Sequence, residues 1–369
     1  MRLSLCETRG MGNKRAASSK PQDARARGAV SLKELAAHLG LSQTTVSLVL
    51  NESPLAASIP YGTKQRIVDA ARGFDYRPNL VARSLRAQRS FTLGVMVPEL
   101  SDGYSAMVLS GIEDHLLSAG YFYFVASHRH NDKLIDRYPD LFHQRRVDGI
   151  IAVDTPYDRP LPIPMVAVSG HHDRDGVTTI KLDHPRAAQL ALEYLVQLGH
   201  QSVAFIKGQA FSSDTEIRWR AICGQAERLG LAVHPDLVAQ LEGDSPSPEL
   251  GYIAGNQLLA SSAEFSALFA FNDVSAIGAI RAFREAGWRV PEDISVIGVD
   301  DIYNAAYFTP ALTTIRQPLR EMGRLAAETL LRRISSGSAK PYPTELTVQP
   351  ELVIRQSTNH RAAKQARSR

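Results

Sequence analysis

The chain of 369 residues is long enough for two or three domains, and its hydrophobic (44%) and charged (22%) fractions are those of an ordinary soluble globular protein. Its two cysteines, Cys6 and Cys223, lie far apart, which argues against a disulfide framework or a cysteine-based metal site and favours a reducing cytoplasm. The net charge of +4 is unevenly divided: residues 1–90 hold 15 Lys and Arg against 6 Asp and Glu, whereas residues 91–360 hold 23 against 32. A basic N-terminal segment followed by an acidic remainder indicates that the N-terminal segment binds phosphates and the remainder does not.

Residues 1–28 are basic and lack the continuous apolar segment of a secretion signal, so we expect a mobile tail there. No run of eighteen apolar residues occurs in the sequence, so no membrane-spanning helix is expected.

The segment 31–51, SLKELAAHLGLSQTTVSLVLN, predicts two short helices joined by a tight turn. Ser31 and Glu34 have the S-x-x-E spacing of a capping box, which marks a helix start. Leu35, Ala36 and Leu39 then form an apolar stripe. The helix is expected to end at Gly40, because glycine adopts positive φ without a steric penalty.

In the second helix Ser42 is the expected N-cap, and Val46, Val49 and Leu50 are spaced to face inward. The residues left on the outer face are Gln43, Thr44, Ser47 and Leu48. A helix–turn–helix of this kind reads base edges in the DNA major groove with the exposed face of its second helix. The alternative is an ordinary αα-hairpin in a protein core.

A third helix is expected to begin near Pro60 and to turn Ile67, Ala70, Ala71 and Phe74 inward. The run YRPNLVARSLRAQRS follows it and ends at Ser90. Together, the three helices and this run resemble the DNA-binding head and hinge of the lactose/galactose repressor (LacI/GalR) family.

The resemblance implies a DNA-binding domain over residues 29–77 and a short hinge helix over residues 78–90. In the family a leucine of the hinge wedges into the minor groove, and the matching residue is Leu85, with Ala82 beside it. A plain linker role for Leu85 is the alternative. The expected DNA contacts are Ser42, Gln43, Thr44, Ser47, Asn51, Tyr76, Arg77, Asn79, Ala82, Arg83, Leu85 and Arg86.

From Phe91 onward, short apolar runs alternate with helical stretches, which predicts parallel sheets covered by helices on both faces. Two such series indicate two α/β lobes with a ligand between them at the carboxyl ends of the strands. We expect one lobe at residues 91–183 plus 316–343 and the other at 184–315 plus 344–358, where TELTVQPELVIRQST reads as one C-terminal β segment. Residues 359–369 read as a basic tail.

The resemblance continues through LSDGYSAMVLSGIEDHL, RRVDGIIAV, LGHQSVAFI, FNDVSAIGAIRAFREAGWRVPEDISVIGVDD and YFTPALTTIRQP, and covers roughly residues 29–356. These motifs resemble the effector-binding module of the same repressors, which has the fold of periplasmic sugar-binding proteins. By this resemblance Arg218 and Asp300 point into the cleft and bond ligand oxygens. Each has the alternative of a structural ion pair.

Tyr104 matches an aromatic residue of the family and could stack on a sugar ring; an ordinary half-buried surface tyrosine is the equal alternative. Asn272 begins a helix, so we expect capping to outweigh ligand contact there. Asp154, Ser169 and Gln317 are further effector candidates from strand ends and the following turn.

Departures from the family pattern leave the effector open. Ser169-Gly170 stands where many relatives have an aspartate and a large residue, and Ser245 stands where some have a stacking tryptophan. Leu48 replaces an arginine of the second helix. These changes remove contacts known from lactose- and purine-responsive members, so neither ligand can be carried over.

The pairs His171-His172 and His128/His130 lack a supporting cluster of ligands, and surface loops are the favoured interpretation over a metal site. The sequence and its resemblance therefore predict a dimeric transcriptional repressor that binds operator DNA and a sugar-like effector. No cofactor, metal or catalytic role is expected. The rival interpretations are a small-molecule-binding protein without a DNA role, argued against by the intact YRPN hinge, and a sugar-processing enzyme, argued against by the missing catalytic motifs.

Overall fold

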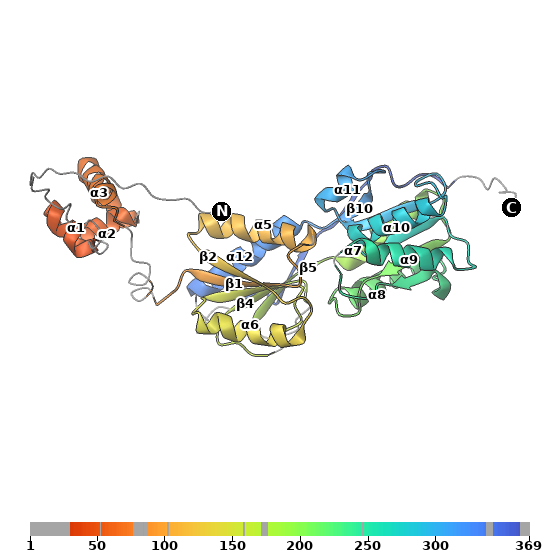
Figure 1. Ribbon diagram of the computed structural model, residues 1–369, viewed down its shortest axis with the longest axis horizontal. Coiled ribbons are helices and arrows are strands. Elements are labelled where there is room, and N and C mark those ends of the chain that lie inside the picture. Colours follow the sequence, from red (N-terminus) through yellow and green to blue (C-terminus); the bar gives the residue numbers. More distant parts are fainter. Residues whose placement is uncertain are drawn as a thin grey trace, which may run out of the picture. The chain divides into compact units, whose positions relative to one another are not determined.

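The computed structural model divides into two compact units, residues 1–83 and residues 84–369 (Figure 1). The residues it describes are 30–51, 53–76, 84, 88–101, 103–157, 159–170, 176–245, 247–336 and 342–361. Within these ranges, no helix has both the length and the apolar character needed to cross a bilayer.

The first unit is a small helical domain. Its elements are α1 (Leu32–Leu39), α2 (Gln43–Leu50), the 3₁₀ helix η1 (Pro54–Ser58) and α3 (Tyr61–Gly73). The capping box of Ser31 and Glu34 is confirmed, and Gly40 ends α1 with φ at 64°. These features set the tight turn that directs α2 across α1.

The core of this domain joins all three α-helices through Leu35, Ala36, Val46, Val49, Ala56, Ile67 and Ala71. The expectation that Phe74 faces inward is wrong: its side chain is 41% exposed, and its ring lies edge-on to His38 at 4.7 Å between centroids. Phe74 follows the last residue of α3, where the chain has left the helical direction. Leu48, expected on the outer face, is half-buried and packs against the core.

The first lobe of the second unit has a six-stranded parallel sheet in the order β11-β5-β4-β3-β1-β2. Its strands are β1 (Thr92–Val97), β2 (Phe122–Ser127), β3 (Gly149–Val153), β4 (Met165–Val168), β5 (Val177–Leu182) and β11 (Glu345–Val348). Helices α5 (Gly103–Ser118) and α12 (Leu319–Ser336) cover one face and α6 (Asp132–Gln144) the other (Figure 1). The α5–α12 pair packs closely because Gly111 and Gly323 present no side chain: a Cβ on Gly111 would lie 1.8 Å from the Arg320 carbonyl oxygen.

The second lobe repeats the design with the order β12-β10-β9-β8-β6-β7. Its strands are β6 (Val203–Lys207), β7 (Val238–Gln240), β8 (Ala267–Ala270), β9 (Ser295–Asp300), β10 (Thr313–Arg316) and β12 (Glu351–Val353), the last antiparallel to β10. Helices α7 (His184–Gln197) and α8 (Thr215–Arg228) pack on one face, and α9 (Glu249–Leu259) and α10 (Asp273–Glu285) on the other. The short elements are η2 (Pro235–Leu237) and α11 (Tyr303–Tyr307).

The C-terminal β segment belongs to both lobes, which corrects the expected assignment of residues 344–358 to the second lobe. Strand β11 pairs in parallel with β5 of the first sheet, from Glu345 opposite Thr179 to Val348 opposite Leu182. Strand β12 pairs with β10 of the second sheet. Pro350 stands between the two strands and has no backbone N–H to continue a ladder, so the chain changes sheets there. The chain therefore crosses between the lobes after β5, after β10 and after β11.

Candidate functional site

The outer face of α2 carries the residues predicted to read DNA. The hydroxyl oxygen of Ser42 accepts from the Thr45 backbone N–H at 3.0 Å, as a helix N-cap. Gln43 and Thr44 are exposed. Ser47 is half-buried, and the Asn51 amide donates to its carbonyl oxygen at 2.8 Å and its hydroxyl at 3.1 Å. The helix thus presents two exposed polar side chains at its N-terminal end, where a recognition helix contacts base edges.

Tyr76 is half-buried beside the core of the helical domain. The remaining predicted DNA contacts, namely Arg77, Asn79, Ala82, Arg83, Leu85 and Arg86, lie outside the described residues.

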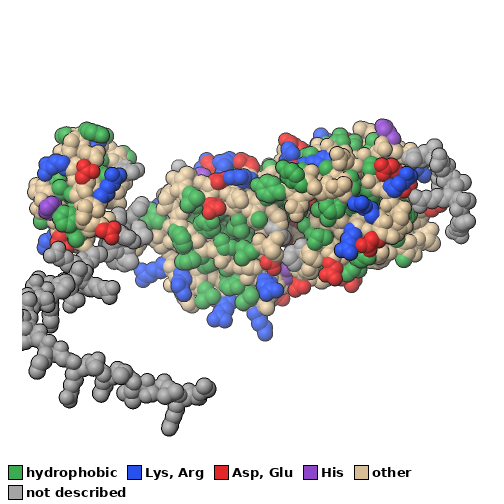
Figure 2. All heavy atoms as spheres, turned by 45° about the horizontal axis from the view of Figure 1, so that its top comes forward, with side chains coloured by type: hydrophobic (Ala, Val, Ile, Leu, Met, Phe, Trp, Pro, Cys, Tyr) green, Lys and Arg blue, Asp and Glu red, His purple; other side chains and the backbone are tan. Residues whose placement is uncertain are grey.

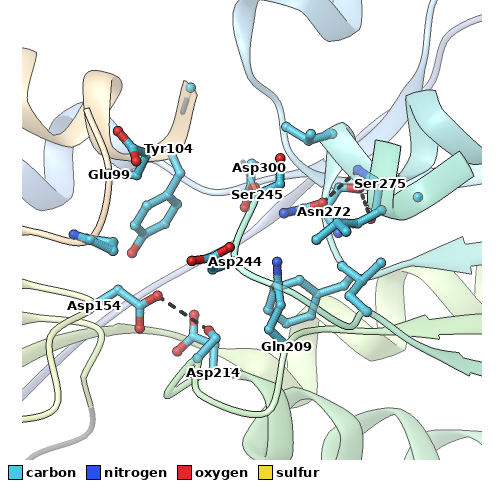
Figure 3. Close-up of a pocket in the computed structure, with 18 of the residues that line it drawn as sticks. Glu99, Tyr104, Asp154, Gln209, Asp214, Asp244, Ser245, Asn272, Ser275 and Asp300 are labelled. Atoms are coloured by element: carbon cyan, nitrogen blue, oxygen red, sulfur yellow. Dashed lines mark hydrogen bonds between the residues drawn. The ribbon is translucent and has the colours of Figure 1, made fainter. Parts of the chain in front are cut away.

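A polar pocket lies between the two lobes, at the carboxyl ends of their strands, and Figure 3 shows its residues. Of the seven predicted effector-binding residues, six line it: Tyr104, Asp154, Arg218, Asn272, Asp300 and Gln317. The other lining side chains include Glu99, His130, Gln209, Phe211, Ser212, Asp214, Asp244, Ser245, Phe271 and Ser275. In the view of Figure 3, Asp244 lies between Asp154 and Asp214 on one side and Asp300 and Asn272 on the other.

Ser169, the seventh predicted residue, joins the pocket indirectly through Tyr104. The Tyr104 and Ser169 hydroxyls lie 2.9 Å apart, and the Ser169 hydroxyl also donates to the Asp214 carboxylate at 3.4 Å. Burial, followed by the negative charges of Asp214 and Asp154, raises the pKa of Tyr104 well above its ordinary value. The phenol therefore remains protonated, and because the Ser169 hydroxyl donates to Asp214, the Tyr104 hydroxyl donates to the Ser169 oxygen. Tyr104 lines the pocket and is not an ordinary surface tyrosine.

Arg218 comes from the first turns of α8 and is 5% exposed. Its guanidinium donates to the Phe271 carbonyl oxygen and to the Asp214 carboxylate, the latter at 3.3 Å, and lies 4.4 Å from the centre of the Phe271 ring. Its Nε has no hydrogen-bond acceptor among the described residues. Arg218 thus faces the pocket as predicted, while its two terminal nitrogens each donate one hydrogen bond to the protein itself.

Asp300 ends β9 in the left-handed region, with φ at 113°, and its carboxylate accepts from the Gln317 amide at 2.6 Å. Behind it, the fully buried Asp273 accepts from the Thr314 hydroxyl at 2.5 Å and the Ile302 backbone N–H at 2.9 Å. Burial, together with the charge of Asp300, raises the pKa of Asp273 well above its ordinary value. The inner of the two carboxyl groups therefore keeps its proton to a higher pH than an ordinary aspartate does.

The prediction of a capping role for Asn272 is confirmed. Its side-chain oxygen accepts from the Ser275 backbone N–H at 2.9 Å, and Ser275 completes a capping box at the start of α10. Asn272 also lines the pocket, so its amide N–H groups remain on the pocket side of the helix end.

The segment Ser212–Asp214, ahead of α8, joins the second lobe to the first. The Ser213 hydroxyl donates to the Asp154 carboxylate at 2.6 Å and accepts from the Gly170 backbone N–H at 2.9 Å. The Ser212 hydroxyl donates to Asp154 at 3.4 Å. Sequence reasoning missed this segment and Asp244. The run S-S-D directly ahead of α8 was a signal for the former, since small polar residues gather at helix starts, although Asp214 makes no side-chain capping bond to the helix.

The expectation that the histidine pairs lie in surface loops is wrong for His128. This side chain is fully buried, its Nε2 lies 3.0 Å from the Thr155 hydroxyl, and burial lowers its pKa to about 4. His130 lines the pocket with its ring 3.9 Å from that of Phe211. His171 and His172 lie outside the described residues.

Comparison with known proteins gives a consistent result. A family model described as a periplasmic binding protein-like domain matches residues 192–358. The HTH-type transcriptional repressor PurR of Pasteurella multocida is 32% identical over 338 residues, covering 89% of this chain and 99% of the relative. Its namesake in Yersinia pestis is 35% identical, covering 88% and 96%.

Solved structures give the same picture. The lac repressor dimer bound to operator and the anti-inducer ONPF is similar with a TM-score of 0.74 and 26% identity, over 90% of this chain and 100% of that one. The complex of the transcriptional regulator CelR with cellobiose gives a TM-score of 0.66 and 26% identity, over 89% and 99%.

Proposed function

The chain belongs to the lactose/galactose repressor (LacI/GalR) family of effector-regulated transcriptional repressors, and we propose that its α2 reads operator DNA while its interlobe pocket binds a sugar-like effector. The observation that carries this proposal is the pairing of a capped α2 with an exposed polar face and a polar pocket at the strand ends of two lobes. A sugar-like effector is further supported by the neighbour described as a cellobiose complex.

DNA reading is assigned to Gln43 and Thr44, because these side chains are exposed and make no hydrogen bond to another residue within the described part of the chain. A glutamine amide can make a bidentate contact with adenine in the major groove, worth about 1–3 kcal/mol of discrimination against the wrong base. Ser47 and Asn51, which bond each other, would hold the end of α2 and contact the DNA backbone. We assign the minor-groove wedge of the hinge to Leu85.

Effector control is assigned to the angle between the lobes. The bonds from Ser213 to Asp154 and from Gly170 to Ser213 join the lobes at the edge of the pocket, so a ligand that engages Asp154 would change the free energy of lobe closure. Lobe movement would alter the spacing of the two hinges in a dimer and hence operator affinity. Such coupling is typically about 1–3 kcal/mol and acts reciprocally on the effector.

Family members act as dimers, and we assign part of the dimer surface to the β2 edge of the first lobe. Figure 2 shows hydrophobic side chains gathered on that lobe, and the exposed apolar residues there include Leu117, Phe122, Phe124 and Val125. Strand β2 is the last strand of its sheet, so its outer backbone groups are open to pairing. A second copy of the chain covering this edge would bury both the apolar side chains and the open strand.

The test compares Gln43→Ala with Gln65→Ala, a matched substitution on α3, where the Gln65 amide bonds Asp69 on the surface. Operator sequences are selected from a random duplex library, and fluorescence anisotropy gives the affinity for operator and for random DNA. Gln43→Ala should weaken operator binding by about 5–150-fold, the equivalent of about 1–3 kcal/mol, with little change on random DNA. Gln65→Ala should behave as the unchanged protein.

The rival function, effector binding without a DNA role, predicts a different outcome from the same experiment. In that case the selection would yield no preferred duplex, and the two substitutions would have equal effects. A log–log salt dependence close to zero would also count against the proposal, because each neutralised phosphate contributes a slope of about −0.9.

A further inference from the structure

The loop that follows β2 has a strained backbone. Arg129 and His130 are consecutive residues in the left-handed region, with φ at 49° and 53°, and neither is a glycine. Residues with a Cβ rarely adopt this conformation, and it persists only where neighbouring contacts hold it. Other parts of the first lobe must therefore fix this loop.

His128, at the start of the loop, supplies one such contact through its ring. The backbone N–H of His130 donates to Nδ1 of His128 at 3.2 Å, and the two imidazole rings lie edge to face with 5.7 Å between their centres. His128 is fully buried and is not one of the residues that line the pocket, whereas His130 lines it. The buried ring thus fixes the position of a pocket residue.

The hydrogen bonds of the His128 ring determine where its proton lies. The Thr155 hydroxyl donates its single proton to the Val153 carbonyl oxygen at 2.8 Å, so it accepts at its 3.0 Å contact with Nε2 of His128. Nε2 therefore carries the ring proton, and Nδ1 is the acceptor that the His130 N–H requires. Burial favours the same neutral ring, because it lowers the pKa of His128 to about 4.

His130 meets the second lobe at Phe211. The centres of the two rings are 3.9 Å apart, the angle between their planes is 34°, and both side chains line the pocket. Phe211 directly precedes Ser212 and Ser213, whose hydroxyls donate to the Asp154 carboxylate of the first lobe. An aromatic contact and a polar contact thus join the lobes through neighbouring residues of one segment.

We propose that His130 and Phe211 form a latch that holds the two lobes together at the pocket, and that His128 is the positioning residue that sets this latch. Separation of the lobes at this place requires the two rings to part, so the latch favours the closed arrangement. Its effect on effector control rests on the proposed function of the pocket. The latch itself depends only on the ring contact and on the loop that presents His130.

Hydrogen–deuterium exchange of the full chain, followed by mass spectrometry, measures the latch without an effector. His128→Leu fills much of the same space but removes the acceptor for His130. Exchange should therefore rise about 2- to 10-fold in residues 126–132 and 208–214, as expected for the loss of one hydrogen bond. In His128→Asn the side-chain oxygen takes the place of Nδ1 and should restore slow exchange. The rise in residues 208–214, which belong to the other lobe, is a result that a merely local role of His128 would not produce.

Phe211→Leu tests the latch from the second lobe. Because Phe211 is 39% exposed, this variant removes no buried side chain, and it should raise exchange in residues 126–132 of the first lobe. Phe308→Leu, at a half-buried phenylalanine of the second lobe that does not line the pocket, should leave that exchange unchanged. His200→Leu controls for general loss of stability, since His200 is buried in the second lobe with its Nδ1 2.9 Å from the Ser266 hydroxyl. It should also leave residues 126–132 unchanged.

Three results would overturn the proposal. The first is unchanged exchange of residues 208–214 in His128→Leu, and the second is equal exchange in His128→Asn and His128→Leu. The third is a rise in residues 126–132 that is as large in His200→Leu as in His128→Leu. Affinity for the selected operator is measured on the same preparations. Absence of specific operator binding by the unchanged protein contradicts the proposed function, whereas unaltered exchange alongside specific operator binding contradicts this inference alone.

Discussion

The buried pair of Arg218 and Asp214 provides a stringent test of how the pocket is held together. The Asp214 carboxylate receives the guanidinium at 3.3 Å, and both side chains are about 6–7% exposed. In Arg218→Gln the carboxylate would lose this cation and the Phe271 carbonyl oxygen would lose its donor. Breaking a buried ion pair from one side costs about 3–5 kcal/mol, so the free energy of unfolding of the second lobe should fall by that amount.

Urea unfolding followed by tryptophan fluorescence measures this loss selectively. The chain has two tryptophans, Trp219 and Trp288, and both belong to the second lobe. Arg220→Gln is the matched control, because Arg220 is exposed and its Nε donates to the Glu216 carbonyl oxygen one turn away on the same helix. It should change the free energy of unfolding by less than about 0.5 kcal/mol.

The double variant Asp214→Asn/Arg218→Gln separates the effect of losing the ion pair from the effect of losing the packing of the arginine side chain. Removing the second charge leaves no uncompensated carboxylate, so the double variant should be more stable than Arg218→Gln alone. The role given to this pair would be refuted if Arg218→Gln lowered the free energy of unfolding by less than about 1 kcal/mol. It would also be refuted if the double variant lost as much stability as the two single variants lose together.

Two further predictions concern a titration and the dimer surface. Because burial raises the pKa of Asp273 above its ordinary value of 3.8, the folded state keeps a proton that the unfolded state releases, so stability should fall as pH rises from about 4 through the folded-state pKa. Asp273→Asn has no such proton to release, so its stability should lack this fall with pH. Urea unfolding at a series of pH values tests this, and parallel curves for the variant and the unchanged protein would contradict the assignment. Phe122→Lys, at a side chain that is 63% exposed on β2, should raise the dimer dissociation constant at least ten-fold in sedimentation velocity. Val196→Lys on α7 is the control, and a dimer of unchanged affinity in Phe122→Lys would remove β2 from the interface.

Local signals in the sequence predicted the elements well. Three examples are the S-x-x-E spacing of Ser31 and Glu34, the glycine at position 40 and Asn272 at a strand-to-helix junction. Each sets a helix end through hydrogen bonds or backbone angles within a few residues, so a short stretch of sequence is enough to predict it. Alternating apolar strands and helices likewise predicted parallel sheets, because both faces of such strands must be buried.

Long-range pairing was the part that sequence reasoning could not supply. The segment containing β11 and β12 reads as one β stretch, and nothing local shows that Val348 aligns with Leu182 of one sheet while Leu352 aligns with Ile315 of the other. The loop residues Ser212–Asp214 and Asp244 were missed for the same reason. Their place in the pocket depends on how two lobes meet, which is decided by packing far from them along the chain.

The three segments that cross between the lobes connect the pocket to the lobe movement that we propose for effector control. One crossing contains Gln317, which bonds Asp300 in the pocket, and the Gln349 amide of another lies 3.4 Å from the Asp183 carboxylate of the third. A ligand can shift a conformational equilibrium only by its difference in affinity for the two states. Since Gln317 is both a lining residue and part of a crossing, a ligand group bound to its side-chain oxygen would act on a segment that joins the two lobes. Under the proposed mechanism, binding at this place would contribute to a change of lobe angle.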